Sequence, residues 1–343
     1  MNDLSLEEWS SMSLSDCTRW AERLAARLPA GFAFRRIRTC SLGEREHRVA
    51  EFDWRDSCFM LVPGGEVELG LDPARPWEPT AEELASWKAS AEEYGIELDI
   101  REHIARVTLG PRTAVLPALL METTAGELGW RTLDSDDPRV RELLDERGDM
   151  RGQHVRIYRG GESLDIDYDD EGGVTVRTEE PITHEEVVAR LASLGFRLPT
   201  GEEWEHACGA GARTLFRWGD HAPCDRYPTD ISPEEAAWRR QWVLSGGKLE
   251  RPPEGFESDW DLHRQPNAFG LFIASDPYKC ELVAEPGTTR GGDGGGMICG
   301  GVGFFLGWLT LATSYFEEHA CRREPGAPVL AGYTIARRVL PLG

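Results

Sequence analysis

The sequence lacks features that mark several large functional classes. Basic residues are scarce, since 38 lysines and arginines stand against 60 aspartates and glutamates and give a net charge of −22. Such a chain repels nucleic acids and anionic membranes, so we expect neither as a partner. No run approaches the roughly 20 apolar residues of a membrane-spanning helix. The acidic N-terminus also has no apolar core that would indicate a signal peptide.

Paired cysteines and clustered histidines are missing as well. None of the eight cysteines forms a C-x-x-C pair, and without a secretion signal we expect reduced thiols and a cytoplasmic location. The eight histidines occur singly, so no H-E-x-x-H zinc motif is present. Phosphate-binding, nucleophile-elbow and dinucleotide-binding motifs are absent too. The sequence therefore contains none of these catalytic or cofactor-binding motifs.

The most informative stretch that is present runs from Phe196 to Asp220. Its lead-in, Arg197-Leu-Pro, predicts extended backbone because a residue that precedes proline avoids the helical region. Thr200 and Glu203 then form a T-x-x-E capping box, which predicts the start of a helix. Trp204 follows on the expected apolar face, and two glycines end the pattern. The stretch predicts a short capped helix fixed by a buried tryptophan.

This stretch, RLPTGEEWEHACG followed by FRWGD, resembles the formylglycine-generating enzyme family, also called the sulfatase-modifying-factor family. Three other segments resemble the same family in the same order. They are Phe59–Gly70, where V-P-G-G predicts a hairpin, Gln265–Phe272, where Asn267 and Gly270 predict a tight turn anchored by Phe269 and Phe272, and the closing Ala331–Arg338. The resemblance implies an irregular α+β fold related to C-type lectins, with little regular secondary structure.

The resemblance places this domain at residues 57–343, behind an N-terminal helix and strand extension at residues 1–56. In the extension, apolar residues at helical spacing predict a helix over 13–28, and alternation then predicts strands. Residues 107–130 predict two strands and a short helix that reaches Trp130.

Two insertions into the family pattern are expected, near residues 72–106 and 134–180. The first contains a capping box at Thr80 and Glu83, which predicts a helix. The second contains the acidic run Asp165–Glu171. We expect a solvated hairpin tip there instead of a calcium loop, because the carboxylates do not have EF-hand spacing.

Active members of the family are understood to hold copper with a cysteine pair that follows an R-G-G-S-W segment. The corresponding segment of this chain, Arg290–Phe305, can be aligned in two ways. The cysteine positions fall on Phe305 and Thr310, or on Gly296 and Gly301. Both cysteines are missing either way, so copper is not expected. Whether a structural calcium of the family is kept stays open, because the matching acidic positions are ambiguous.

Few residues are left that could carry altered chemistry: Cys299, Glu281, Trp308 and Tyr315. Glu281 is the only acid that can stand for the glutamate of the family's G-N-V-W-E-W, and a buried, inert thiol is the favoured interpretation of Cys299. The sequence therefore predicts a divergent member without copper-dependent thiol oxidation, which binds an unknown protein or small-molecule ligand. The alternative is an oxidoreductase with altered active-site chemistry. A third hypothesis is a structural subunit whose acidic face docks a basic partner.

Overall fold

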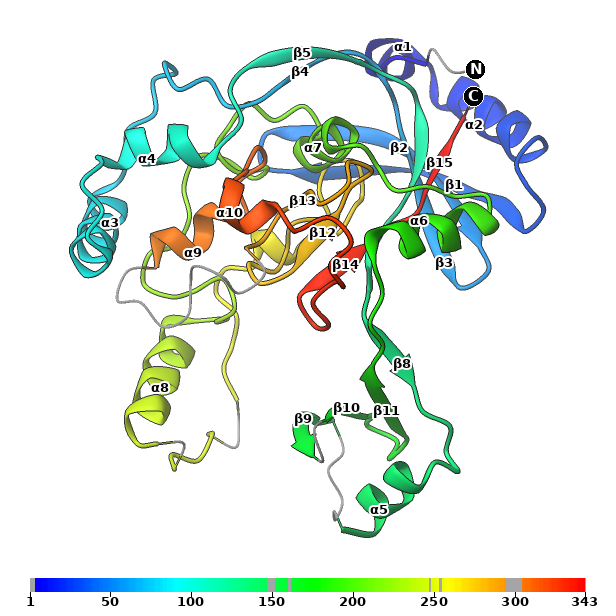
Figure 1. Ribbon diagram of the computed structural model, residues 1–343. Helices are drawn as coiled ribbons and strands as arrows, with labels where there is room; N and C mark the ends of the chain where they lie inside the picture. The colour runs from blue at the N-terminus through cyan, green and yellow to red at the C-terminus, as the bar shows by residue number, and fades with distance from the viewer. Residues whose placement is uncertain are drawn as a thin grey trace.

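The computed structural model describes residues 4–146, 152–159, 162–246, 248–252, 255–293 and 304–342. Within these ranges the chain has a mixed α+β structure, in which helices surround several small β-sheets (Figure 1). The α+β class predicted from the sequence is thereby confirmed. No helix in the described part of the chain is both long and apolar enough to cross a lipid bilayer.

The largest sheet joins the N-terminal residues to the rest of the chain. Its strand order is β1-β2-β3-β6-β15. The bounds are β1 Phe32–Leu42, β2 Arg45–Trp54, β3 Ser57–Val62, β6 Leu119–Glu122 and β15 Val339–Pro341. Helices α1 (Leu6–Ser11) and α2 (Leu14–Ala25) pack on this sheet through buried Trp9 and Trp20. The predicted helix over 13–28 is confirmed, with Ser13 as its N-cap.

The Pro63-Gly64-Gly65 link does not close a hairpin, so that prediction is wrong. Strand β3 pairs with β2 and β6, whereas β4 (Gly65–Leu69) pairs with β5 (Arg112–Leu116) in a separate two-stranded sheet. Gly64 is required there because a Cβ would overlap the carbonyl oxygen of Leu116, and Gly65 has a left-handed φ of +104°. The glycines turn the chain from one sheet into another.

The predicted helix that reaches Trp130 is also wrong. Gly126–Glu127 forms strand β7 and Trp130–Thr132 forms β8. Strand β7 pairs with β14 (Thr334–Ala336), far along the chain. Two glycines in this stretch weaken a helix, and Gly129 has a φ of +79° that a helix does not allow.

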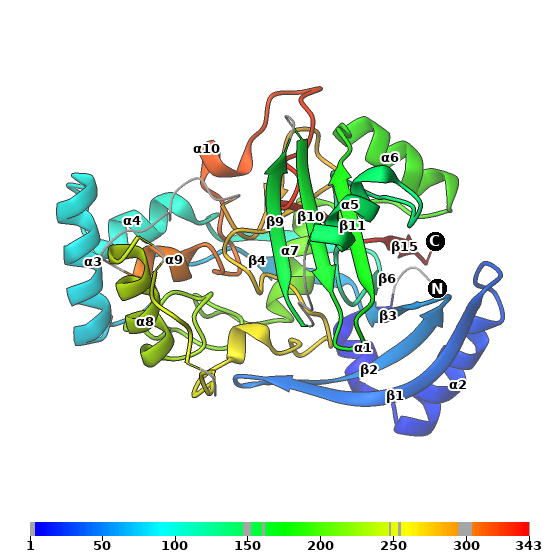
Figure 2. The same cartoon turned by 90° about the horizontal axis from the view of Figure 1, so that it is seen from below.

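The second insertion forms a small unit of its own. Its sheet has the order β8-β11-β10-β9 and carries one helix, and an apolar cluster lies inside it. The bounds are α5 Pro138–Glu146, β9 His154–Arg159, β10 Glu162–Tyr168 and β11 Val174–Glu179. Figure 1 shows this unit below the main body, joined to it through β8 and β11, and Figure 2 shows β9, β10 and β11 side by side from below.

The acidic run in this unit is only partly a turn, because Asp165–Tyr168 belongs to β10. The side chain of Asp165 is 0% exposed and accepts hydrogen bonds from Arg156 and Arg177. Burial alone raises the pKa of Asp165, but the hydrogen bonds and charge of Arg177, together with smaller contributions from His154 and Arg156, outweigh burial and hold that pKa below its usual value. Arginines therefore surround this carboxylate, and only the residues from Asp169 onward form the hairpin tip.

The first insertion forms helices α3 (Ala81–Tyr94) and α4 (Ile100–Val107), and the capping box of Thr80 and Glu83 is confirmed. Both helices contribute to the core that contains α9 (Phe305–Leu309). The short α10 (Glu318–Cys321) contributes Cys321 to the same core, whereas α6 (His184–Ser193) and α8 (Pro233–Leu244) lie outside it.

His263 lies against the rings of Trp218, Trp260 and Trp308, and it should make the stability of the fold sensitive to acid. Its ring stacks on Trp260, its Nε2 bonds the carbonyl oxygen of Pro228 at 2.7 Å, and its buried Nδ1 has no partner. Burial lowers the pKa of His263 to about 4. The pKa of His263 in the folded protein lies below the ordinary value of 6.5. Above pH 6.5 this histidine therefore does not lower the free energy of unfolding, and as the pH falls from 6.5 toward 4 that free energy decreases.

We expect protonation linked to this histidine alone to lower the free energy of unfolding by about 3 kcal/mol as the pH falls from 6.5 to 4. Urea unfolding between pH 7 and pH 4 measures the loss. In His263→Leu the decrease should be smaller by that amount, and the same decrease in both proteins would assign the acid sensitivity to other groups.

Candidate functional site

The predicted helix after R-L-P-T is present as α7 (Gly201–Gly209). Thr200 and Glu203 form the capping box, with bonds of 3.1 and 2.8 Å between each side chain and the other residue's backbone N–H. The same Glu203 carboxylate receives two hydrogen bonds from Arg197, at 2.6 and 2.7 Å. Trp204 is 0% exposed. The motif thus fixes the helix start and buries the tryptophan, as the sequence predicts.

Asn267 ties the second resembling segment to the end of α7. Its Nδ2 donates to the carbonyl oxygens of Ala207 and Cys208, at 2.6 and 2.9 Å. Its Oδ1 accepts from the backbone N–H groups of Phe269 and Leu271, each at 3.0 Å. One buried amide therefore satisfies helix-end carbonyls and also holds the turn.

The turn itself agrees with the prediction at Gly270, whose φ is +79°, and at Phe269, which is fully buried. The expectation that Phe272 is a second anchor is wrong, since its side chain is 43% exposed. Phe272 contributes a backbone carbonyl to the site instead.

A small sheet of order β13-β12-β14-β7 lies next to this turn. Strands β12 (Cys280–Leu282) and β13 (Thr289–Arg290) run antiparallel and place Glu281 opposite Arg290. Gly291 and Gly292 follow with left-handed φ values of +60° and +61°. A Cβ at Gly292 would overlap the backbone of Lys279, and one at Gly291 would crowd the ring of Trp204. Both positions require glycine.

These segments line a cavity of about 240 Å³ that is open to solvent. Residues from each of them line it: Trp204, Phe272, Ala274, Glu281, Arg290 and Arg337. Ala274 has a φ of +47°, a conformation that a non-glycine residue adopts at a cost, and its carbonyl oxygen accepts a bond from buried Arg217. The cavity therefore lies where α7, the Asn267 turn and the small sheet meet.

Within this wall, Arg337 lies in a cage of oxygen atoms. Its guanidinium donates to both carboxylate oxygens of Glu281, at 2.6 and 3.1 Å. It also donates to three backbone carbonyls, those of Glu122, Thr123 and Phe272, at 2.7 to 3.2 Å. Both charged side chains are almost fully buried. Calcium also prefers carboxylate and carbonyl oxygens as ligands. In this site those oxygens accept hydrogen bonds from Arg337 instead.

Two other lining residues carry buried donors without a partner. The indole Nε1 of Trp204 has none, and neither do Nε and Nη1 of Arg290. Arg290 is 9% exposed, and burial lowers the pKa of its guanidinium from the usual value. The guanidinium lies over the ring of Phe316, with Cζ 4.8 Å from the centroid. An unpaired buried cation is costly to a fold.

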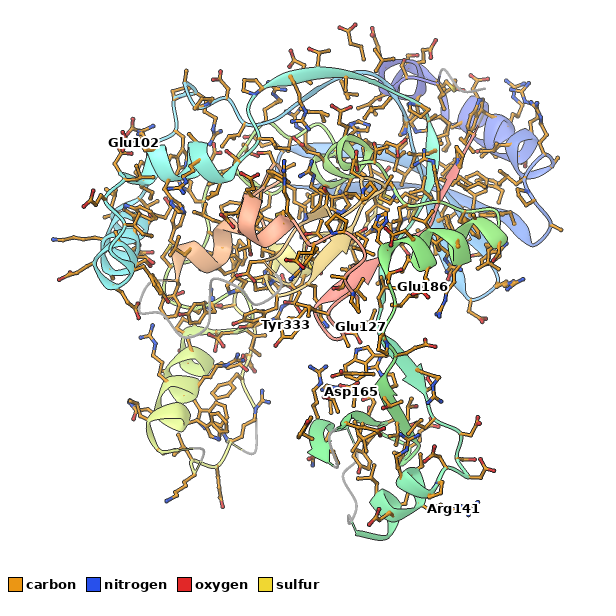
Figure 3. The ribbon with its side chains drawn as sticks, in the orientation of Figure 1. Glu102, Glu127, Arg141, Asp165, Glu186 and Tyr333 are labelled. Atoms are coloured by element: carbon orange, nitrogen blue, oxygen red, sulfur yellow. The ribbon has the colours of Figure 1, made fainter. Side chains whose placement is uncertain are left out.

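A pair of ionic contacts links this cavity to the second insertion. Lys279 and Glu127 line the cavity and form an ion pair, and Glu127 also pairs with Arg177 at 3.1 Å. In Figure 3, Glu127 and Tyr333 lie at the junction between the main body and the unit that contains Asp165.

Larger cavities of about 410 and 630 Å³ also occur in the described structure. The buried carboxylate in the first, Glu205, pairs with Arg112 at 2.5 Å, and the one in the second, Glu122, pairs with Arg338. The smaller cavity is therefore the candidate site, because two of its lining residues, Trp204 and Arg290, carry buried donors without a hydrogen-bond partner.

The structure separates the side chains that the sequence offers for altered chemistry. Glu281 lines the candidate cavity, but Trp308 and Tyr315 lie in the core around α9 and do not. The indole of Trp308 donates to the carbonyl of Arg226 at 3.0 Å, and burial raises the pKa of Tyr315 well above its usual value. Cys299 lies outside the described residues.

The described residues do not fit a copper site of the kind that the resemblance implies. In one alignment the cysteine positions are Phe305 and Thr310, both buried and neither a thiol; in the other they are Gly296 and Gly301, outside the described residues. Burial raises the pKa of Cys208, Cys224 and Cys321 to about 12, so these thiols stay protonated. No group of three or more metal-ligating side chains is found in the described ranges.

Comparison with known proteins found no match, either among protein-family models or among curated proteins. The site therefore has to be interpreted from its own geometry. The sequence did not predict that Asn267 bonds the carbonyls at the end of α7. It also did not predict that Arg290 and Arg337 line the cavity. The only available signals were the asparagine inside the P-N-A-F-G turn and the arginines beside the glycine pair and in the closing strand.

Proposed function

We propose that this chain is a divergent relative of the formylglycine-generating enzymes, which keeps the family's frame as a ligand- or protein-binding module and has lost thiol oxidation. The observation that carries the proposal is the convergence of three resembling segments on one cavity. Trp204 comes from the R-L-P-T segment, Phe272 from P-N-A-F-G-L-F and Arg337 from the closing strand. The irregular, C-type-lectin-related fold is part of the proposal.

Two observations support the loss of oxidation. The glycine pair after Arg290 requires glycine at both positions, as expected if Arg290-Gly-Gly corresponds to the family's R-G-G. The copper cysteines are then replaced by Gly296 and Gly301, which have no ligating side chain. A cytoplasmic location belongs to the same proposal, because the seven cysteines in the described ranges are all free, which agrees with a reducing compartment.

Copper retention tests this proposal. The purified full-length protein is loaded with Cu(I), washed with a competing Cu(I) chelator and weighed by native mass spectrometry. We expect no copper to remain, because buried thiols with a pKa of about 12 are poor ligands. One copper ion per chain after the wash would contradict the proposal, and Cys299→Ser would then show whether that thiol contributes to the retained metal.

A further inference from the structure

One edge of strand β4 has no partner strand in the described part of the chain. Strand β4 pairs with β5 along its other edge, in a two-stranded sheet. Its residues Glu66–Leu69 line the cavity of about 410 Å³, which opens to solvent and is also lined by the end of α7. Figure 1 shows β4 and β5 along the top of the molecule, above α7. An unpaired strand edge presents backbone donors and acceptors with which a further strand can pair.

The hydrogen bonds at the two ends of β4 identify the backbone groups that face this cavity. Before the strand, the N–H of Gly64 donates to the carbonyl of Leu4 at 2.9 Å, and its carbonyl accepts from the N–H of Leu6 at 3.1 Å. After the strand, the N–H of Gly70 donates to the side chain of Glu205 at 2.6 Å. Both partners come from segments that line the cavity. Gly64 and Gly70 therefore direct their N–H groups to the same edge.

Glu66 and Glu68 lie between these glycines at the same two-residue spacing. Since successive residues of a strand direct their N–H and C=O groups to opposite edges, those of Glu66 and Glu68 face the cavity. Leu71, at the alternate spacing, donates instead to Leu109, on the side of β5. Within the described residues, no bond satisfies the backbone groups of Glu66 and Glu68 on the cavity edge.

The N-terminal segment of the chain begins to cover this edge and then leaves it. Ser5 forms a parallel β-bridge with Gly64, but Ser5 is also the N-cap of α1, which begins at Leu6. The chain therefore adds one strand position to the edge, and the helix then carries it away. Beyond Gly64 the edge stays open over the central part of β4.

The exposed charges around the open edge favour a basic partner. Glu7 and Glu66 both line the cavity, are exposed and form no ion pair within the described structure. Glu68 pairs with Arg213 at 3.2 Å, but both side chains are largely exposed, so this contact is weak. The three carboxylates outnumber the single cation of the cavity wall.

The two remaining ionisable side chains of the cavity do not change this balance. Glu205 is paired with Arg112 and so adds little net charge. The Nε2 of His206 bonds the carbonyl oxygen of Pro63 at 2.9 Å, and burial lowers the pKa of His206, so its ring is neutral at pH 7. The open edge thus has a negative charge that its own surroundings do not compensate.

We propose that the cavity edge of β4 binds an extended, lysine- or arginine-rich peptide segment of a partner protein, which adds to the sheet as a third strand. Backbone bonds to Glu66 and Glu68 supply the pairing, and the carboxylates select a basic segment. Alternate side chains of the peptide then lie on the exposed face with these glutamates, and the others lie beside Val67 on the more buried face. This surface shares no lining residue with the candidate cavity, so the assignment is independent of that site.

A short, fluorescently labelled peptide in which lysine and valine alternate is the probe, titrated into the full-length protein at constant ionic strength and followed by anisotropy. We expect this peptide to bind and the corresponding glutamate–valine peptide not to bind. Two further peptides carry N-methyl groups either on every lysine or on every valine, which removes those N–H donors. Only one of the two should lose binding, because alternate residues of a strand present their N–H groups to opposite edges.

Three protein variants test the edge from the other side. Glu66→Pro removes the N–H that faces the cavity and should weaken peptide binding by about fivefold or more. Glu66→Gln removes only the charge and should weaken binding about twofold, a difference that added salt abolishes. Val115→Pro is the matched control, because Val115 lies opposite Glu66 on β5, faces the outer edge of that strand and does not line the cavity. It should leave peptide binding unchanged.

Thermal unfolding reports whether each variant is folded, and the methylated peptides test the edge in the wild-type protein if Glu66→Pro is not. No binding of the lysine–valine peptide, or equal binding of the glutamate–valine peptide, would overturn the basic partner. Equal loss of binding with both methylated peptides, or loss with neither, would overturn strand addition. Copper retention is measured without any peptide, so failure here is distinct from failure of the proposed function.

Discussion

Replacing Arg337 by methionine is expected to lower the free energy of unfolding by about 3–5 kcal/mol. The change leaves the Glu281 carboxylate buried without its cation, and it removes one donor from each of three backbone carbonyls, of which that of Thr123 keeps the bond from the N–H of Phe272. Desolvation of the unpaired carboxylate is the main cost, because the side chain of Glu281 is only 2% exposed. Urea unfolding at pH 7 measures the effect.

Two further variants separate loss of the pair from loss of packing. In Arg337→Met/Glu281→Leu the unpaired charge is removed, so this protein should regain most of the stability that the single variant loses. Arg338→Met is the neighbouring control, since Arg338 pairs with Glu122 in a more exposed position, and it should cost less. A double variant that is as unstable as the single one would show that the oxygen cage, and not the charge, dominates.

Asn267→Ala is expected to cost about 4 kcal/mol or more. Four hydrogen bonds disappear, and the partners left behind are buried backbone groups at the end of α7 and in the following turn. Each unsatisfied buried group costs about 1–3 kcal/mol. Because this residue connects two of the segments that form the cavity, the loss acts on the frame of the candidate site itself. Urea unfolding at pH 7 measures the effect.

Asn267→Asp gives the sharper version of this test. The acid keeps an oxygen that can accept from Phe269 and Leu271, but it places a second oxygen against the carbonyls of Ala207 and Cys208. We expect a strongly destabilised protein at pH 7. Gln265→Ala, which removes one exposed bond to Asp261, should change stability by less than about 0.5 kcal/mol. Similar small losses in all three variants would contradict a locking role for Asn267.

The sequence predicted the features that depend on near neighbours in the chain. The capping boxes at Thr80 and Thr200 both form, because each needs only a glutamate three residues later. The prediction failed where a strand had to choose a distant partner. Strand β4 pairs with β5 and not with β3, and β7 pairs with β14 although a helix was expected there.

The site could be predicted only in outline for the same reason. Trp204 and Glu281 were singled out from local motifs, and both line the cavity. Arg290 and Arg337 look alike in the sequence, yet one is unpaired and the other is caged by carbonyls as far as 215 positions away. Whether an arginine forms an ion pair depends on residues that are distant in the sequence, so the local pattern around Arg290 and Arg337 does not predict it.

Turnover of a cysteine-containing peptide tests most directly the claim that the family's frame is kept without its oxidation chemistry. The full-length protein is supplied with Cu(I), oxygen and a thiol reductant, and mass spectrometry follows conversion of the peptide cysteine to formylglycine. We predict that the peptide stays unchanged, both in wild type and in Cys299→Ser. Formylglycine that accumulates with wild type and not with a heat-inactivated sample would contradict the account.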